Sequence, residues 1–358
     1  MEHTQEVQAA GGHLRRSVVR TLKSILDERS LSQAIQAAYG LSTKTHVQLY
    51  RISGSDVYRA RDGTHTWFLK VYRSTERDAE RARSAVRAID LLGRHGFSVP
   101  QLIPTRRGEP VVELQAVEGP RVAYMYRSVG GIMPTYHDPQ HGSRFGRTAA
   151  QMHQVMDEFA SPEDFRVIDA DTLFGRYIEG IERLLDPEAS VMRFLRRLAR
   201  ALWREVSRLP RTPPQYGFCH GDLHTGNALL TEANELVLLD FDACGFGWRA
   251  MDIGTYYASN DWMNLSAGSR QARRQSLAYF LEGYNAVRPL TEAEYRAIDL
   301  FMAIRHFELL GLLLERVPFS GDHWVNHREF QAHVAWFEAW LDTCEGFDID
   351  RMLDVESS

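Results

Sequence analysis

One polar segment and the apolar run behind it constrain this chain more than any other feature. Asp222 and Asn227 stand five positions apart in a segment that also holds two glycines and a threonine, a composition that suits a loop better than a helix interior. Residues 235–241 then form a short apolar run that is typical of a buried strand. The strand ends at Asp240, where a carboxylate is costly unless it meets a cation or hydrogen-bond donors. We therefore expect these three polar side chains to face a common point.

Such an arrangement suits phosphoryl transfer, a reaction that needs positioning and charge more than covalent help. Asp222 is predicted to be the catalytic residue that orients the attacking hydroxyl. Asn227 and Asp240 are predicted to be metal ligands, because Mg²⁺ prefers oxygen donors. The plainer interpretation of the same residues is an Asx-rich loop that caps a helix.

The motif also carries a family resemblance. The pattern His220-Gly-Asp222-Leu-His-Thr-Gly-Asn227, followed by Leu-Asp240-Phe, resembles the aminoglycoside phosphotransferase and choline-kinase-like family, a branch of the protein kinase fold. The resemblance implies an α+β, bilobal, protein-kinase-like fold with a small antiparallel-sheet N-lobe and a mainly helical C-lobe. It also implies ATP and Mg²⁺ as cofactors, and it gives His220 and Asp252 the role of structural support for the catalytic loop. Asp252 alone would also suit a helix N-cap.

The predicted N-lobe contains a buried cation. Residues 46–72 alternate in polarity around two turns and predict three strands. Lys70 lies in the last of them between apolar neighbours, where an ammonium needs an anion. This strand resembles the kinase strand whose lysine meets the α- and β-phosphates. The spacing of apolar residues predicts a helix over 75–95, in which Glu80 is the expected partner of Lys70 and Glu76 its rival. Both acids also suit the first turn of a helix for its dipole alone.

The remaining nucleotide contacts follow from the resemblance. The turn at residues 53–55 takes the place of the phosphate-covering loop, although it has one glycine and a plain hairpin turn explains it equally well. The stretch from residue 124 to residue 128 takes the place of the hinge that holds adenine through its backbone. The predicted cofactor-binding residues are therefore Ser53, Gly54, Ser55, Lys70, Glu80, Tyr124, Tyr126 and Ser128.

The predicted organisation has an N-terminal helical extension over 1–45, an N-lobe over 46–126 and a helical C-lobe over 127–358. Helices are expected over 13–27 and 31–39 in the extension, and over 143–159, 171–185, 191–209, 269–285, 291–316 and 330–343 in the C-lobe. In the family that this sequence resembles, the C-terminal helices select the substrate. The candidate substrate contacts there are Asp261, Trp262, Arg305 and Glu308, which carry both signs of charge and leave the charge of the substrate open.

Composition restricts the class of protein. A formal net charge of −5 does not suggest nucleic-acid binding, and no apolar run approaches the length of a membrane span. Three scattered cysteines without metal spacing indicate a reducing cytoplasm. The N-terminus has neither the basic start nor the apolar core of a signal peptide. Nothing in the sequence indicates the oligomeric state.

Three functions remain open from the sequence. We favour an ATP- and Mg²⁺-dependent kinase that phosphorylates a hydroxyl of a small molecule by direct in-line transfer. The first alternative is a stress-response Ser/Thr protein kinase. Residues 68–73, 128–131 and 146–154 resemble both that group and homoserine kinase type II, but no Ala-Pro-Glu segment follows Asp242. The second alternative is a catalytically silent, nucleotide-binding pseudokinase scaffold, against which the intact Lys70, Asp222, Asn227 and Asp240 argue.

Overall fold

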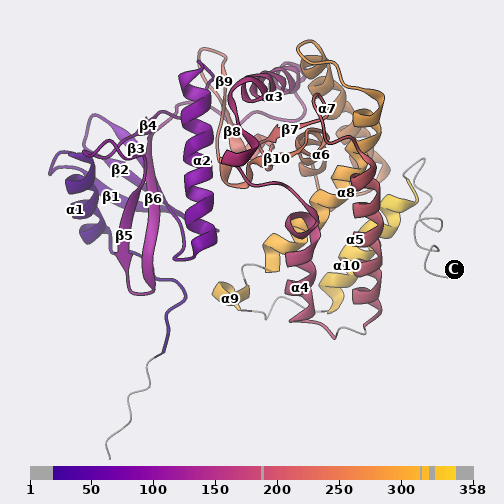
Figure 1. The fold of residues 1–358 in the computed structure, drawn as a ribbon, viewed down its shortest axis with the longest axis horizontal. Helices are drawn as coiled ribbons and strands as arrows, with labels where there is room; N and C mark the ends of the chain where they lie inside the picture. The colour runs from indigo at the N-terminus through magenta and orange to yellow at the C-terminus, as the bar shows by residue number, and fades with distance from the viewer. Residues whose placement is uncertain (1–18, 187–188, 315–316, 322–326, 344–358) are drawn as a thin grey trace, which may run out of the picture.

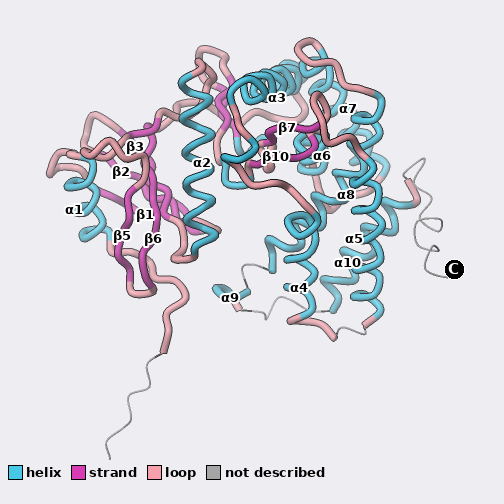
Figure 2. The backbone as a smooth tube through the Cα atoms, viewed as in Figure 1, coloured by secondary structure: helices cyan, strands magenta, loops and turns pink. Residues whose placement is uncertain are grey.

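The computed structural model describes residues 19–186, 189–314, 317–321 and 327–343. They form a sheet-containing small lobe and a helical large lobe, with α2 between the sheet and the helices of the large lobe (Figure 1). This α+β arrangement is the predicted one. Figure 2 shows the separation plainly, because the long strands gather in the small lobe and helices dominate the large one.

The small lobe is built on an antiparallel sheet with the order β1-β2-β3-β6-β4, and β5 also pairs with β6. Apolar residues on one face of the sheet pack with α1 around Ile35, Leu69 and Met125, while α2 and Tyr124 join the core that extends into the large lobe. The strands are β1 (His46–Ile52), β2 (Asp56–Arg61), β3 (Thr66–Val71), β4 (Leu102–Ile103), β5 (Val112–Ala116) and β6 (Gly119–Arg127).

Helices α1 (Glu28–Tyr39) and α2 (Glu76–Arg94) begin at side-chain caps. Asp27 accepts a hydrogen bond from the backbone N–H of Ser30 at 2.8 Å, and Thr75 caps α2 in the same way. The prediction of a helix over 13–27 is wrong for the described part, because residues 19–27 form no helix and the cap at Asp27 starts α1 after them. Residues 13–18 lie outside the described residues.

The crossing between the lobes is short. The backbone N–H of Ser128 donates to Thr66 of the small lobe at 3.0 Å. Ile132 and Leu230 exchange backbone hydrogen bonds of 2.9 and 2.8 Å in the large lobe. Gly131 between them has a φ of +152°, and a Cβ there would lie 2.6 Å from the carbonyl oxygen of Leu230, so that only glycine fits.

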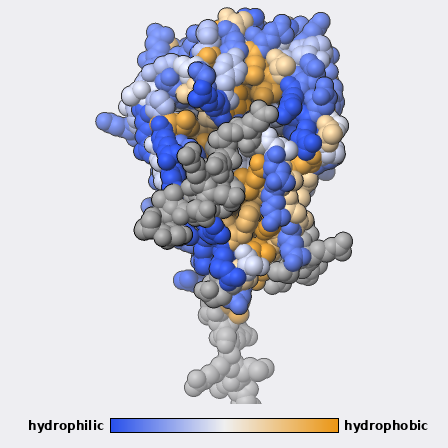
Figure 3. All heavy atoms as spheres, turned by 90° about the vertical axis from the view of Figure 1, so that its right-hand side faces the viewer, coloured by the Kyte–Doolittle hydropathy of each residue, from blue (hydrophilic) through white to orange (hydrophobic). Residues whose placement is uncertain are grey.

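The large lobe packs α3 against α7 and α6 against α8. Its outer face carries a broken band of apolar residues between hydrophilic flanks (Figure 3). Asp138 caps α3 with Pro139 in the first turn, which is why α3 starts before the predicted residue 143. The helices are α3 (Pro139–Phe159), the π-helical turn η2 (Asp171–Gly175), α4 (Arg176–Glu182), α5 (Ser190–Arg208), α6 (Ala250–Ser259), α7 (Ala267–Asn285), α8 (Glu292–Leu314), α9 (Val317–Ser320) and α10 (His327–Leu341).

Two small antiparallel pairs carry the loops of the site. They are β7 (Tyr216–Cys219) with β10 (Gly245–Trp248), and β8 (Ala228–Leu230) with β9 (Leu236–Leu238). The segment after β7 and the segment after β9 therefore meet beneath the small lobe. We keep the division into a 1–45 extension, a 46–126 N-lobe and a 127–358 C-lobe as a proposal, and note that α1 packs against β1 of the small lobe.

Candidate active site

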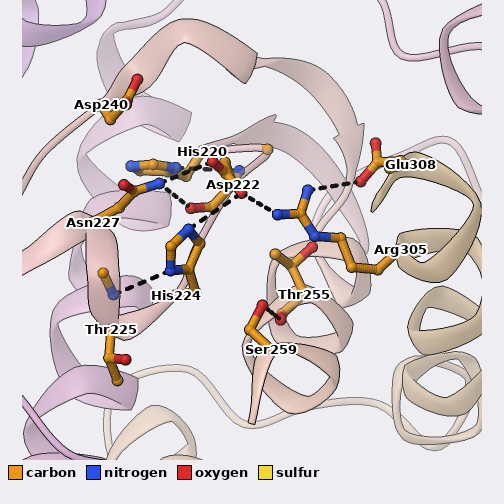
Figure 4. Close-up of polar contacts among 12 residues, drawn as sticks. His220, Asp222, His224, Thr225, Asn227, Asp240, Thr255, Ser259, Arg305 and Glu308 are labelled. Atoms are coloured by element: carbon orange, nitrogen blue, oxygen red, sulfur yellow. Dashed lines mark hydrogen bonds and ion pairs between the residues drawn. The ribbon is translucent and has the colours of Figure 1, made fainter. Parts of the chain in front are cut away.

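The loop that follows β7 brings Asp222 and Asn227 together (Figure 4). The Asn227 amide Nδ2 donates to Asp222 twice, to its carboxylate Oδ2 and to its carbonyl oxygen, both at 2.9 Å. The single turn of 3₁₀ helix at Thr225–Asn227 produces this geometry, because it folds the loop back on itself. The two residues that the sequence singled out are thus direct neighbours.

Asp252 fixes the start of the same loop. Its carboxylate accepts the backbone N–H groups of His220 and Gly221, both at 2.8 Å, and contacts His153 Nε2 at 3.0 Å. Burial opposes its ionisation, but the hydrogen bond and charge of His153 outweigh this and lower the pKa of Asp252. Asp252 lies in the first turn of α6 and not at the N-cap, because the helix begins at Ala250. His153 is buried, and burial lowers its pKa to about 4.

The loop after β7 and the segment after β9 approach each other closely at their backbones. Gly221 has a φ of +80°, and a Cβ on it would lie 2.1 Å from the carbonyl oxygen of Ala243. Only glycine fits at this position. His220 adds a second connection, because its ring Nε2 lies 2.9 Å from the carbonyl oxygen of Leu239.

Asp240 faces Lys70 from the segment after β9. Its backbone is left-handed, with φ 61° and ψ 66°, an uncommon conformation for a residue other than glycine. This conformation turns the carboxylate toward the small lobe, where Oδ1 lies 2.7 Å from the Lys70 ammonium. Asp242 contacts the same ammonium at 2.6 Å and accepts a hydrogen bond from the Tyr72 hydroxyl. Lys70 is therefore shared between two carboxylates.

Burial and charge set the ionisation of this cluster. Burial alone would lower the pKa of Lys70, but Asp240 and Asp242 raise it well above its ordinary value. Burial also works to raise the pKa of Asp240, and Lys70 reverses that effect. For Asp242 burial prevails, and its pKa rises to about 6.

The predicted pairing of Lys70 with Glu80 is not what the structure shows. Glu80 and its rival Glu76 are both exposed, and the buried face of α2 carries small apolar residues such as Ala82 and Ala85. Asp242 supplies the second anion instead. The sequence feature that could have indicated this is that Asp242 occupies the position that is glycine in protein kinases. Tyr72, which the sequence analysis did not select, completes the cluster.

A cavity of about 360 Å³ lies over these residues, between the lobes. Ser53, Gly54 and Ser55 form the turn between β1 and β2 but are not among the residues that line it. Of the predicted nucleotide and metal residues, the lining includes Lys70, Tyr124, Tyr126, Ser128, Asn227 and Asp240.

Two of the four predicted substrate contacts lie beside Asp222. Arg305 on α8 is an ion-pair partner of Asp222, and its Nη1 donates to Glu308 at 3.1 Å (Figure 4). The other two have different neighbours. Asp261 accepts from the Ser269 hydroxyl at 2.8 Å, and Trp262 packs against His306. Among the described residues, neither Asp261 nor Trp262 forms a hydrogen bond or an ion pair with Asp222.

Arg305 controls the charge of Asp222. Burial works to raise the pKa of Asp222, but the guanidinium of Arg305 and then His224 hold it far below its usual range. The carboxylate is thus fully ionised at neutral pH. One of its oxygens faces Arg305 and the other faces Asn227.

The residues fit a magnesium site. Asn227 and Asp240 line the same cavity and offer an amide and a carboxylate oxygen, the donor types that Mg²⁺ takes together with phosphate and water oxygens. Within the described residues no group of three or more His, Cys, Asp or Glu side chains forms a metal cage. A donor set of this kind is typical of Mg²⁺ that arrives with a phosphate substrate.

A sequence model of the APH family, described as the phosphotransferase enzyme family, matches residues 50–290. The chain belongs to this family. The resemblance stated above is therefore confirmed. Within the described residues, no helix of this phosphotransferase is long and apolar enough to cross a membrane.

Individual relatives agree with this assignment. The phosphotransferase is 24% identical over 306 residues to the amicoumacin kinase of Bacillus subtilis (strain 168), a match that covers 83% of this chain and 88% of the relative. A solved structure of the amicoumacin kinase hAmiN, in complex with AMP-PNP, Ca²⁺ and Ami, aligns with a TM-score of 0.73 and 22% identity over 91% of this chain and 97% of that chain. A microcompartment-associated aminopropanol kinase aligns with a TM-score of 0.68 and 24% identity over 91% and 98%. The predicted protein-kinase-like fold is confirmed.

Proposed function

We propose that this phosphotransferase transfers the γ-phosphoryl group of ATP to a hydroxyl of a small molecule in a Mg²⁺-dependent reaction. The observation that carries the proposal is the convergence of Asp222, Asn227 and Asp240 from two loops with Lys70 from the small lobe. Transfer of a phosphoryl group needs this set of parts: a carboxylate for the attacking hydroxyl, oxygen ligands for a divalent ion and a cation for the phosphates. Amicoumacin kinase and aminopropanol kinase are named for small-molecule acceptors, which supports the choice of acceptor class.

Each residue has a defined task in the proposed mechanism. Asp222 accepts the hydrogen bond of the acceptor hydroxyl and takes its proton as the oxygen forms its bond to phosphorus. The bond from phosphorus to the ADP oxygen breaks in line with that attack, and no phosphoenzyme forms. Asn227 keeps Asp222 in place through Nδ2 while its Oδ1 stays available to a metal ion.

Lys70 and Asp240 serve the donor. Asn227 and Asp240 would hold Mg²⁺, which when bound neutralises charge on the phosphates. Asp242 contacts the Lys70 ammonium at 2.6 Å and would keep it in place if Asp240 served as a metal ligand. Tyr124, Tyr126 and Ser128 also line the cavity, and we place the base of the nucleotide beside them. Cys219 and Cys244 are free and buried, which fits a reducing compartment, and we place the enzyme in the cytoplasm on that ground.

The test is ADP release from ATP and Mg²⁺ across a panel of amino alcohols, hydroxy acids and aminoglycosides, with a generic protein substrate as a separate arm. Asp222→Asn serves as the inactive control and Asp90→Asn, on the exposed end of α2, as the matched one. Transfer to a small molecule supports the proposal. Transfer to protein alone would identify the stress-response type of protein kinase. ATP binding without any transfer would identify the pseudokinase scaffold.

A further inference from the structure

A second cavity, of about 300 Å³, lies between α2 of the small lobe and the η2–α4 segment of the large lobe. Four arginines line it among the described residues: Arg77 and Arg81 on α2, Arg166 before η2, and Arg176 at the start of α4. Asp242 lines it as well, but this carboxylate is already paired with Lys70. The two other acids of the lining, Glu80 and Asp171, are exposed, as is Arg77, and Arg81 is paired with Asp78 at 3.4 Å. The lining therefore holds four arginines against three acids, a small excess of positive charge.

This cavity adjoins the phosphate end of the nucleotide cavity. Lys70 and Asp240 line the first cavity, and Asp242 lines the second. The three side chains form one ion-paired cluster, with Lys70 at 2.7 Å from Asp240 and 2.6 Å from Asp242. The cluster is thus a wall between the two cavities, and a ligand of the second cavity would lie next to the transferred phosphoryl group.

Arg176 lacks partners for part of its guanidinium. Arg176 as a whole is half-buried, but its Nε and Nη1 are shielded from solvent and have no hydrogen-bond partner among the described residues, while Nη2 donates to the Tyr177 hydroxyl. Arg166 differs, because it donates to the carbonyl oxygens of Ala243 and Cys244 and is thereby held in the wall of the cavity. A buried cation with unpaired N–H groups is costly, and an anionic ligand removes that cost.

A line of charges connects the cavity with Asp222. Burial raises the pKa of Glu308, and the charges of Arg305 and Arg176 oppose that rise. Glu308 accepts from Arg305 at 3.1 Å, and Arg305 contacts Asp222. The charges of Arg176 and Arg305 both act on Glu308, so Arg176 and Asp222 are linked electrostatically through this carboxylate.

We propose that this cavity binds an anionic group of the acceptor, a carboxylate or a phosphate ester, with Arg176 as its principal contact. The inference rests on the proposed function and narrows it, because the acceptor becomes an alcohol that carries a negative charge. Arg166 contributes positive charge from the large-lobe side of the cavity, and Arg81 contributes from α2, where it is paired with Asp78. Arg305 remains on Asp222 and Glu308 and is not needed for this contact.

The experiment compares alcohols that differ only in the anionic group. Homoserine is measured against propanolamine, serine against ethanolamine, and glycerol phosphate against glycerol, each as kcat/KM with ATP and Mg²⁺. Binding of the same six compounds to the AMP-PNP-loaded protein is measured by calorimetry. The variants are Arg176→Gln and Arg176→Lys, with Arg94→Gln as the matched control, because Arg94 is exposed at the other end of α2 and pairs with Asp90.

We expect the kcat/KM of at least one alcohol that bears a carboxylate or phosphate to exceed that of its counterpart without this group by roughly tenfold or more, as for a charge-assisted hydrogen bond. Arg176→Gln should remove this preference, Arg176→Lys should keep part of it, and Arg94→Gln should keep all of it. Equal turnover and equal binding within all three pairs would overturn the inference, as would a preference that survives in Arg176→Gln. Anion binding through Arg176 without transfer to any alcohol would instead refute the proposed function and leave the binding site standing.

Discussion

Arg305 on α8 donates a hydrogen bond from Nη2 to Oδ1 of Asp222, a residue 83 positions earlier in the chain. The contact joins the C-terminal helices to the catalytic loop. It also occupies one oxygen of Asp222 and leaves the other to Asn227 and the acceptor. The helices that are expected to choose the substrate thereby also orient the carboxylate that is proposed to serve it.

Replacing Arg305 with Gln should move the acidic limb of the pH–rate profile to higher pH. Without the guanidinium, the largest influence that lowers the pKa of Asp222 is gone, so this pKa rises, and the active form is the ionised one. The profile of kcat/KM between pH 5 and pH 9 checks this. Arg305→Lys retains the positive charge but cannot bridge Asp222 and Glu308 as the guanidinium does, so it should shift the pH–rate profile less than Arg305→Gln. A profile that superimposes on that of the parent protein would rule out the contact as an electrostatic control.

Replacing Asp222 with Asn should lower kcat by about 10² to 10⁴ while leaving the dissociation constant for ATP nearly unchanged, because the carboxylate serves the acceptor and not the nucleotide. Steady-state kinetics and calorimetry measure the two quantities separately. Retention of kcat would remove Asp222 from the catalytic role.

Replacing Asp240 with Ala should abolish the dependence of nucleotide binding on Mg²⁺. The carboxylate is the one charged metal ligand that we propose, and its loss leaves Asn227 alone with the phosphates. Titration of AMP-PNP with and without Mg²⁺ provides the measurement, and Asp90→Asn provides the control. An unchanged Mg²⁺ dependence would exclude Asp240 from the metal site.

Replacing Asp242 with Asn should raise the KM for ATP by roughly tenfold with a smaller effect on kcat, because Lys70 loses the anion that keeps it in place. Tyr72→Phe removes only the hydroxyl that contacts Asp242 and should have a weaker effect in the same direction. Glu80→Gln serves as the decisive comparison, because the kinase pattern predicts a large effect there and the structure predicts none. A larger loss in Glu80→Gln than in Asp242→Asn would restore the original pairing.

The buried pair of His306 and His333 should make the protein less stable in acid. Their ring nitrogens lie 2.9 Å apart between α8 and α10, and burial lowers the pKa of both, for His333 to about 4. A histidine whose folded-state pKa is depressed stabilises the fold above its unfolded pKa of about 6.5 and loses that contribution as the pH falls toward the folded value. At pH 5 the loss is about 2 kcal/mol for His333.

Urea unfolding at pH 7.5 and pH 5 tests this expectation. His333→Gln should lose less stability between the two pH values than the parent protein, because Gln does not take up a proton. His65→Gln, at an exposed position in the small lobe, should behave like the parent protein. Equal losses in all three proteins would show that the pair does not govern acid stability.

The sequence was informative where chemistry and position coincide. Asp222, Asn227 and Asp240 belong to two adjoining loops, so their spacing predicted that the three side chains would lie close together. In the structure Asn227 contacts Asp222 and lines the same cavity as Asp240. The strands of the small lobe and most helices of the large lobe were predicted from periodicity, because their buried residues recur at regular intervals. The ends of the helices depended on capping residues such as Asp138, and the periodicity of apolar residues does not indicate where a cap lies.

The partner of Lys70 was not predictable in the same way. The sequence favoured Glu80 with Glu76 as its rival, and the pairing with Asp242 depends on how α2 rotates about its axis and on the left-handed backbone of Asp240. Both are consequences of tertiary packing. Arg305 was selected as a possible substrate contact, but its approach to Asp222 joins segments far apart in the chain, and no local pattern encodes such a contact.

The link between Ser128 and Ile132 has a mechanical consequence. Ser128 is tied to the sheet and Ile132 to Leu230, so the covalent passage from one lobe to the other has only Val129, Gly130 and Gly131 free of those ties. Rotation about the backbone bonds of these three residues is what allows the two lobes to open and close over a nucleotide. The loop with Asp222 does not take part, since Asp252 fastens it to α6, and Asp222 and Asn227 therefore keep their geometry when the small lobe, which carries Lys70, turns.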